Sequence, residues 1–192
     1  MRDEVDQVVQ RTQLPSIEDQ ERLPYVMAFI YEVMRYTSFV PVTIPHSTTS
    51  DTSINGYRIP KNTVIFVNQW SSNLNPKRWT RPEVFDPLRF LDESGALDKD
   101  QTSNVLIFSV GKRRCIGEDL AKMHLFLFTS LMVHQCEMKA DPSRPISMDY
   151  SYGLTLKPKS YRVAISLRDN LKLLKNVVSL LHVQTDEAGE TN

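Results

Sequence analysis

The sequence predicts a mainly helical fold with small β-sheets, which is the α+β class. Apolar residues recur every three or four positions in residues 24–36 and again in 120–133, the period of a helix that packs on a core. Apolar and polar residues alternate around turn-forming residues in 43–67 and in 154–165, as in short β-hairpins. Helices combined with short hairpins indicate the mixed class.

Length and composition exclude several classes of protein. The chain has 192 residues and 41% hydrophobic residues, enough to bury a core. Lys plus Arg and Asp plus Glu are both 23, so no excess of positive charge attracts nucleic acid. Two cysteines are too few for a disulfide framework and fit a reducing compartment. No signal peptide is present, and the longest apolar stretch, 125–133, is too short to cross a bilayer.

The first third of the chain predicts two helices. Residues 2–11 form a helical pattern with no capping residue ahead of it, as though the sequence began inside an element. A second helix opens at Pro24 and ends near Tyr36. Glu32 and Arg35 are three residues apart and therefore neighbours on this helix, either as a solvated ion pair of little worth or as part of a structural network.

The middle of the chain predicts strands and then irregular structure. Asn55-Gly56 favours a hairpin turn, and residues 64–67 are expected to form a buried strand. Prolines interrupt any regular element in 75–90, where aromatic residues would keep the coil packed. Glu118 and Asp119 then lie in the first turn of the predicted helix over 120–133, where negative charge is favourable.

The end of the chain predicts a second hairpin and a last helix. The hairpin pairs residues 154–156 with 161–165 around 157–160. Ser166 is expected to cap a short helix that ends near His182. We expect one domain over residues 1–182 and a disordered tail over 183–192.

Residues 108–117 carry the strongest chemical signal. They read Phe-Ser-Val-Gly-Lys-Arg-Arg-Cys-Ile-Gly and deliver Cys115 to the start of the apolar helix. Arg113, Arg114 and the free N–H groups of that helix favour a thiolate, and a lone thiolate suits haem iron. The alternative is a cysteine packed as a small hydrophobe. Gly111 and Gly117 favour the ligand, because they let the backbone pass close to a flat partner.

Three motifs resemble those of the cytochrome P-450 superfamily. The cysteine loop resembles its ligand signature, Phe-x-x-Gly-x-Arg-x-Cys-x-Gly. Residues 32–35 resemble its Glu-x-x-Arg helix, and residues 87–90 its Pro-x-Arg-Phe segment. The motifs occur in the family's order, and the segments 39–46 and 66–70 resemble animal family 1, subfamily B most of all. The resemblance implies that residues 1–182 are the C-terminal portion of a longer P-450 domain.

The resemblance also implies roles for individual residues. Cys115 would be the catalytic axial ligand of the iron of haem b, and the other haem contacts would be Arg113, His46, Phe108, Gly111 and Gly117. Arg113 and His46 would bind the propionates, while Phe108 would cover the cysteine. The substrate contacts would be Val40, Thr43, Ile44, Leu154 and Thr155, unless these residues are ordinary core. Glu32, Arg35 and Arg89 would form a buried, structural charge network.

The implied activity is that of a haem-thiolate monooxygenase, an oxidoreductase that uses O2 to oxidise apolar aromatic, steroid or retinoid substrates. Electrons would come from NADPH-cytochrome P-450 reductase. Lys112 and Arg114 could bind this acidic partner; the alternative is that they form a basic patch exposed to solvent with no partner. Full-length members are expected on the cytoplasmic face of the endoplasmic reticulum membrane, through an N-terminal anchor that this sequence lacks.

Alternatives to an active enzyme remain at this point. The sequence lacks the family's oxygen-activating helix, so we expect the isolated chain to be inactive. It would then be a non-catalytic truncated isoform or a reductase-binding module. A zinc-bound structural domain would use Cys115, His124, His134 and Cys136, but their spacing matches no familiar zinc site.

Overall fold

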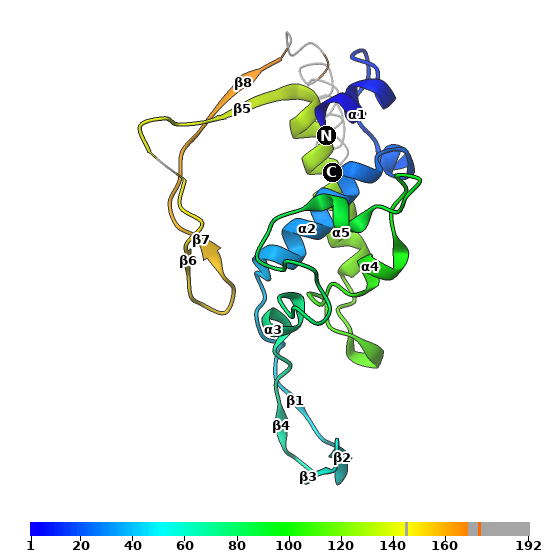
Figure 1. Ribbon diagram of the computed structural model, residues 1–192, viewed down its shortest axis with the longest axis vertical. Helices are drawn as coiled ribbons and strands as arrows, with labels where there is room; N and C mark the ends of the chain where they lie inside the picture. Colours follow the sequence, from blue (N-terminus) through cyan, green and yellow to red (C-terminus); the bar gives the residue numbers. More distant parts are fainter. Residues whose placement is uncertain (145, 169–172, 174–192) are drawn as a thin grey trace, which may run out of the picture. The chain divides into compact units, whose positions relative to one another are not determined.

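The computed structural model describes residues 1–144, 146–168 and 173, and it has helices beside small antiparallel sheets (Figure 1). The α-helices are α1 (Arg2–Val8), α2 (Pro24–Thr37), α3 (Gln69–Asn73), α4 (Lys99–Ser103) and α5 (Glu118–Gln135). The 3-10 helices are η1 (Ile17–Arg22), η2 (Pro87–Phe90) and η3 (Gly111–Arg113). The α+β class predicted from the sequence is confirmed.

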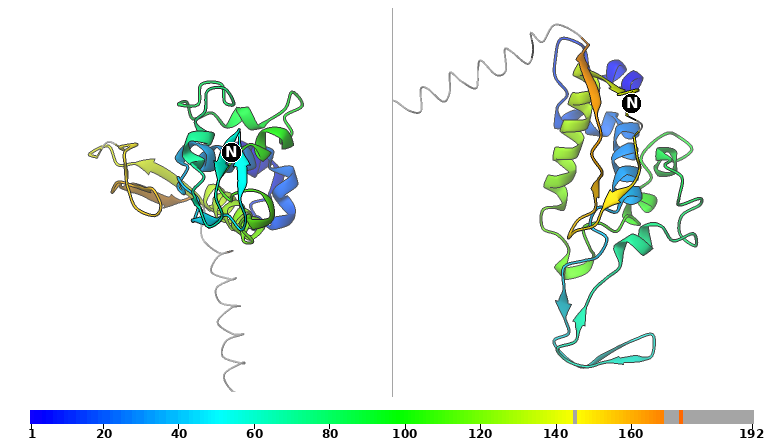
Figure 2. Two further views of the ribbon diagram at one scale, coloured as in Figure 1. Left: turned by 90° about the horizontal axis from the view of Figure 1, so that it is seen from below. Right: turned by 90° about the vertical axis from the view of Figure 1, so that its left-hand side faces the viewer.

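The strands of the described residues form antiparallel pairs. They are β1 (His46–Ser47), β2 (Thr52–Ile54), β3 (Tyr57–Ile59), β4 (Val64–Ile65), β5 (Cys136–Ala140), β6 (Tyr150–Ser151), β7 (Lys157–Pro158) and β8 (Val163–Leu167). The pairs are β1 with β4, β2 with β3, β5 with β8, and β6 with β7. The predicted Asn55-Gly56 turn joins β2 to β3, with φ angles of 50° and 83°. Beyond β1 and β4, this hairpin forms an arm (Figures 1 and 2).

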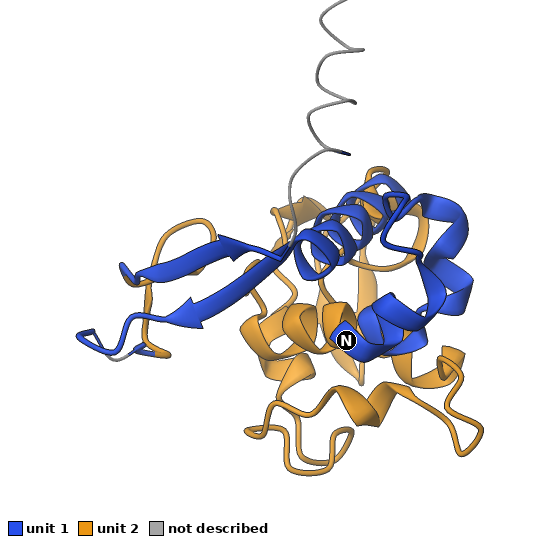
Figure 3. Ribbon diagram, turned by 90° about the horizontal axis from the view of Figure 1, so that it is seen from above, with its two compact units in different colours: residues 1–27, 119–147, 160–192 blue, residues 28–118, 148–159 orange. Residues whose placement is uncertain are grey.

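The chain divides into two compact units, which Figure 3 colours separately. Unit 1 comprises Met1–Met27, Asp119–Ser147 and Ser160–Asn192, and unit 2 comprises Ala28–Glu118 and Met148–Lys159. Among the described residues, no helix combines the length and apolar character needed to traverse a bilayer.

In unit 1, charged side chains connect the N-terminal segment to other elements. The Glu4 carboxylate accepts hydrogen bonds from the N–H groups of Tyr25 (2.7 Å) and Val26 (3.0 Å), in the first turn of α2. These N–H groups have no partner within the helix, so the carboxylate satisfies them and complements the helix dipole. Arg168, after β8, forms an ion pair with Asp6 and donates to the Val133 carbonyl (3.1 Å).

His134 is buried in unit 1 near the end of α5, with no exposed surface. Gln135 Nε2, which can only donate, lies 2.7 Å from His134 Nδ1, so Nδ1 accepts. Desolvation by burial and then the nearby Arg11 cation lower the pKa of His134. The sequence-based expectation of a surface position for His134 is wrong, whereas His124 is exposed as expected.

Unit 2 is built around a buried ion pair. Arg35 Nε and Nη2 donate to the two Glu32 oxygens at 2.6 and 2.7 Å, and neither side chain is exposed. Arg89 Nε lies 3.2 Å from Glu32 Oε2. Arg35 also donates to the Asn73 carbonyl (3.0 Å) and the Pro82 carbonyl (2.9 Å). The network thereby fixes the end of α3 and the coil at Pro82.

Aromatic side chains surround this network. Phe90 packs on Tyr31 and on Trp79, with ring centroids 5.7 Å apart in both pairs. The Arg35 guanidinium lies 5.5 Å from the centre of the Trp79 ring, close enough for a cation–π contact. The coil over residues 75–90 is therefore packed by its aromatic residues.

Three expectations about local structure are wrong. Residues 64–67 do not form a buried strand, because β4 is short and Val64, Phe66 and Val67 are exposed. Residues 154–156 do not pair with 161–165: β7 pairs with β6, and β8 with β5. Alternation predicts the faces of a strand but does not identify its partner. Ser166 lies inside β8 and caps no helix there. The predicted last helix is almost entirely outside the described residues, as is the whole predicted tail over 183–192.

Replacing Glu32 by alanine would leave the Arg35 charge buried without its counterion. We expect Glu32→Ala to lower the free energy of unfolding by about 3–5 kcal/mol, measured by urea denaturation of the full chain. The control is Arg58→Ala, which breaks the exposed Arg58–Asp51 pair and should cost less than about 1 kcal/mol. Equal losses in the two variants would contradict the structural role of the buried network.

The lowered pKa of His134 predicts that the folded chain loses stability in mild acid. Its folded pKa is lowered, so below about pH 6.5, the unfolded value, the unfolded chain binds more protons than the folded one. Stability therefore falls as the pH drops through this value toward the folded pKa, by at most about 1.4 kcal/mol per pH unit. Unfolding at pH 7.5 to 5 should show this slope in wild type and in His124→Gln, and a smaller one in His134→Gln. An unchanged slope in His134→Gln would refute the assignment.

Candidate functional site

The cysteine loop of residues 108–117 is held by its own backbone. The N–H of Cys115 donates to the Phe108 carbonyl at 2.8 Å, which closes the loop. Ser109 and Gly111 have φ angles of 63° and 76°, in the left-handed region. Glycine adopts this conformation without strain, which gives Gly111 a backbone role. Cys115 is exposed and lies three residues before the first residue of α5.

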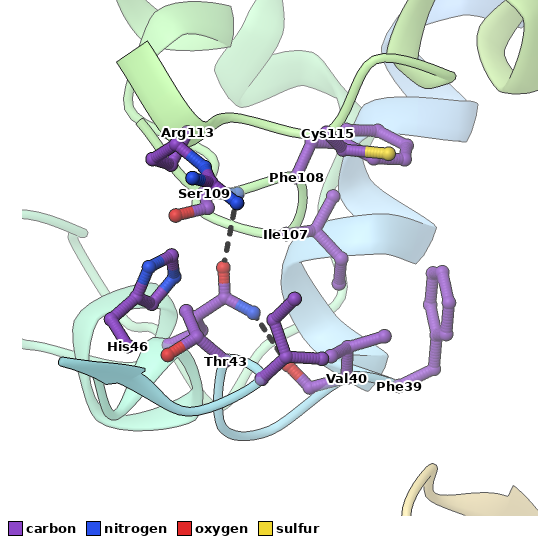
Figure 4. Close-up of a pocket in the computed structure, with 11 residues that line it drawn as sticks. Phe39, Val40, Thr43, His46, Ile107, Phe108, Ser109, Arg113 and Cys115 are labelled. Carbon is purple, nitrogen blue, oxygen red and sulfur yellow. Dashed lines mark hydrogen bonds between the residues drawn. The ribbon is translucent and has the colours of Figure 1, made fainter. Parts of the chain in front are cut away.

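A pocket of about 330 Å³ lies against this loop within unit 2. Its lining is Phe39, Val40, Thr43, Ile44, His46, Gln69, Ile107, Phe108, Ser109, Arg113 and Cys115. Figure 4 shows the segment after α2 on one side and the cysteine loop on the other. The pocket therefore joins an apolar surface to one thiol and two basic side chains.

Most of the residues singled out from the sequence meet at this pocket. Cys115, Arg113 and Phe108 come from the cysteine loop, and His46 is the first residue of β1. Val40, Thr43 and Ile44 come from the segment between α2 and β1. This grouping brings together side chains that are up to 75 positions apart, from Val40 to Cys115.

Four of the predicted residues do not line the pocket. Leu154 is 88% exposed, and Thr155 is half-buried elsewhere in the turn between β6 and β7. The next residue, Leu156, donates its N–H to the Phe39 carbonyl at 2.8 Å, so this turn begins beside a lining residue. Gly111 and Gly117 have no side chain and are not among the residues that line the pocket. A Cβ added at Gly117 would lie 3.8 Å from Cys115 Sγ, which places this glycine next to the thiol.

Sequence reasoning missed Gln69 and Ser109. Gln69 Nε2 donates to the Val40 carbonyl at 3.1 Å, and Gln69 Oε1 accepts from the Ser109 N–H at 3.2 Å. No pattern in the sequence marks a glutamine at the start of a short helix as part of a pocket. Ser109 could have been noticed, because it lies inside the cysteine loop beside Phe108.

The donor set determines which ligands the site can take. One thiol and one imidazole do not make a structural zinc site, which needs four ligands, and the Arg113 guanidinium has no free lone pair to offer a metal. Within residues 1–144, 146–168 and 173, no group of three or more His, Cys, Asp or Glu side chains could hold a metal ion. The site instead suits a ligand with an apolar body, an anionic edge and a centre that accepts a soft ligand.

Comparisons with known proteins agree with this arrangement. A family model described as Cytochrome P450 matches residues 1–165. Human cytochrome P450 1B1 is 59% identical over 181 residues, 94% of this chain and 33% of the human protein. Rat cytochrome P450 1A2 is 50% identical over 159 residues, 82% of this chain and 31% of the rat protein. The chain thus spans about a third of the length of these curated relatives.

A solved structure gives the same result. A zebrafish cytochrome P450 determined with abiraterone superimposes with a TM-score of 0.78 and 34% sequence identity. The match covers 88% of this chain and 39% of that chain. The family, and the subfamily that the motifs resemble, are therefore confirmed as predicted from the sequence.

Alanine substitutions at the two glycines of the loop should differ in how much stability they cost. Gly111→Ala forces a β-carbon into the left-handed region and should cost about 1–2 kcal/mol of unfolding free energy. Gly117→Ala serves as its control, because the new methyl group meets only Cys115 Sγ at an ordinary contact distance and should cost less than about 0.5 kcal/mol. Urea unfolding of both variants measures the difference, and a loss in Gly117→Ala as large as that in Gly111→Ala would contradict it.

Proposed function

The chain belongs to the cytochrome P450 family, and on that premise we propose that its pocket binds haem b with Cys115 as the axial iron ligand. The observation that carries the proposal is the position of one exposed thiol in the wall of an apolar pocket that also contains Arg113 and His46. A thiolate is a soft ligand for iron, and the two basic side chains are suited to two carboxylates.

The residues of the pocket fit such a group. Arg113 can present its planar guanidinium to a propionate through two parallel hydrogen bonds, and His46 can donate to a second one. Phe108 and Ile107 give apolar cover near the thiol, which limits water at the ligand. Cys115 is exposed, so its thiol is accessible to a ligand. Bound haem would supply activation of O2, which a thiolate ligand favours over a histidine ligand.

The proposal extends to the substrate class. Phe39, Val40, Thr43 and Ile44 give the pocket a wall with few polar groups. Such a wall favours apolar aromatic, steroid or retinoid molecules over polar ones. We assign Val40, Thr43 and Ile44 to substrate contact. Leu154 and Thr155 would take part only if the turn between β6 and β7 folded over the pocket.

Partners and location follow from the family rather than from a contact. Lys112 and Arg114 are exposed in the cysteine loop and offer positive charge to an acidic NADPH-cytochrome P450 reductase. We propose the cytoplasmic face of the endoplasmic reticulum membrane for the full-length form. Because this chain spans about a third of its relatives, we propose that it binds haem without efficient turnover when isolated. The same observation favours a second candidate, a non-catalytic chain that binds reductase.

Spectroscopy of the reduced, carbon monoxide-bound chain tests the haem proposal. Wild type and Cys136→Ser, loaded with haem, should give a strongly red-shifted Soret band, because a thiolate ligand donates electron density to the iron and so shifts the absorption of the carbon monoxide complex. Cys115→Ser should lose this band, and Arg113→Gln should weaken haem binding by about tenfold through loss of a bidentate contact. A red-shifted band that survives in Cys115→Ser would refute the assigned ligand.

A further inference from the structure

We propose that Gln69 and Asn73, the first and last residues of α3, form an amide clamp that positions the cysteine loop against the apolar wall of the pocket. Both side chains are buried, with 1% and 0% of their surface exposed. The effect on the iron ligand rests on the proposed function, whereas the effect on the loop does not.

Gln69 joins the two sides of the pocket directly. Its amide nitrogen donates to the Val40 carbonyl at 3.1 Å, and its amide oxygen accepts from the Ser109 N–H at 3.2 Å. Figure 4 draws both bonds as dashed lines. Val40 belongs to the apolar wall, and Ser109 is the second residue of the cysteine loop. One side chain therefore links these two segments directly.

Asn73 makes the second connection. Its amide nitrogen donates to Ser38 Oγ at 3.0 Å and to the Leu106 carbonyl at 2.7 Å. Its amide oxygen accepts from the Leu106 N–H at 2.8 Å. The clamp thus holds the segment after α2 at Ser38 and Val40, and the segment before the cysteine at Leu106 and Ser109.

The sequence of α3 explains how both amides reach these partners. Residues four positions apart lie on the same face of a helix, so Gln69 and Asn73 point the same way. Asn68 fixes the start of α3, because its side chain accepts from the Ser71 N–H at 2.9 Å. The Trp70 N–H donates to the Pro41 carbonyl at 3.0 Å. These two hydrogen bonds hold α3 in place in addition to the bonds that the Gln69 and Asn73 amides make.

An amide satisfies both segments. Each clamp residue faces a backbone carbonyl and a backbone N–H at once, so it must donate and accept. A carboxylate lacks the donor and an apolar side chain lacks both. A hydrogen-bond partner matters most for Ser109, a non-glycine residue with φ of 63° that must be held in a strained conformation.

Cys115 lies at the far end of the segment that the clamp holds. Its N–H is bonded to Phe108, the neighbour of Ser109. Releasing Ser109 therefore releases the residue that closes the loop around the thiol. We assign Gln69 as a positioning residue for Cys115, one that acts through Ser109.

Amide hydrogen exchange of the full chain tests the clamp without haem. The Ser109 amide should be protected in wild type and should exchange at least about tenfold faster in Gln69→Met, a side chain of similar size that cannot donate and accepts only weakly. The matched control is Ser71→Ala, at an exposed position of the same helix; it keeps the backbone N–H that binds Asn68 and should leave Ser109 protected. An unprotected Ser109 amide in wild type, or equal rates in wild type and Gln69→Met, overturns the clamp.

The carbon monoxide spectrum tests the effect on the ligand. In the haem-loaded Gln69→Met chain, the share of the strongly red-shifted Soret band should fall by about half or more relative to Ser71→Ala, because a mispositioned thiolate ligates less well. If Gln69→Met does not fold, Gln69→Glu replaces it: its carboxylate still accepts from Ser109 but cannot donate to Val40, so the same band should fall less. Faster Ser109 exchange with an unchanged band would overturn the positioning role. A red-shifted band missing from wild type itself would instead refute thiolate ligation by Cys115, and Ser109 exchange would still decide the clamp.

Discussion

The buried guanidinium of Arg35 is the constraint on which unit 2 depends. A guanidinium has five N–H donors and cannot lose its charge, so every donor removed from water needs an acceptor. Two donors bind Glu32, and the others bind the carbonyls of Asn73, Pro82 and Val84. Those carbonyls belong to the end of α3 and to the coil before η2, which forms no sheet. The charge therefore determines where irregular chain must run, and the aromatic rings of Tyr31, Trp79 and Phe90 exclude water from it.

Asn73 links this network to the pocket. Its backbone carbonyl accepts from Arg35, while its side chain binds both backbone groups of Leu106. The same residue therefore satisfies the buried charge and fixes the segment that leads into the cysteine loop. Polar networks of this kind are costly when one member is left unsatisfied. For this reason the charge pair, α3 and the loop form one connected hydrogen-bonded system rather than separate features.

The sequence predicted the parts of this system whose chemistry is local. Arg35 follows Glu32 by one helical turn, and Cys115 lies in a loop with glycine and arginine, so their types and spacing carry the signal. Gln69 and Asn73 were missed because their partners are backbone groups 29 to 40 residues away, which no pattern in a single sequence reveals. The pairing of β5 with β8 was missed for the same reason. His134 was misplaced, because a histidine near a helix end carries no sign of burial.

The composition of the pocket restricts what can complete it. Ile44 and Ile116 are exposed apolar side chains, the first in the pocket and the second beside Cys115 in the loop, and such surface is unfavourable in water unless a ligand covers it. A ligand that bound only the thiol would leave this apolar surface exposed to water and would provide no counterion for Arg113. A purely apolar ligand would in turn leave the thiol and Arg113 unused. Haem has a metal centre, an apolar ring and carboxylates at one edge, and it therefore satisfies the three requirements together.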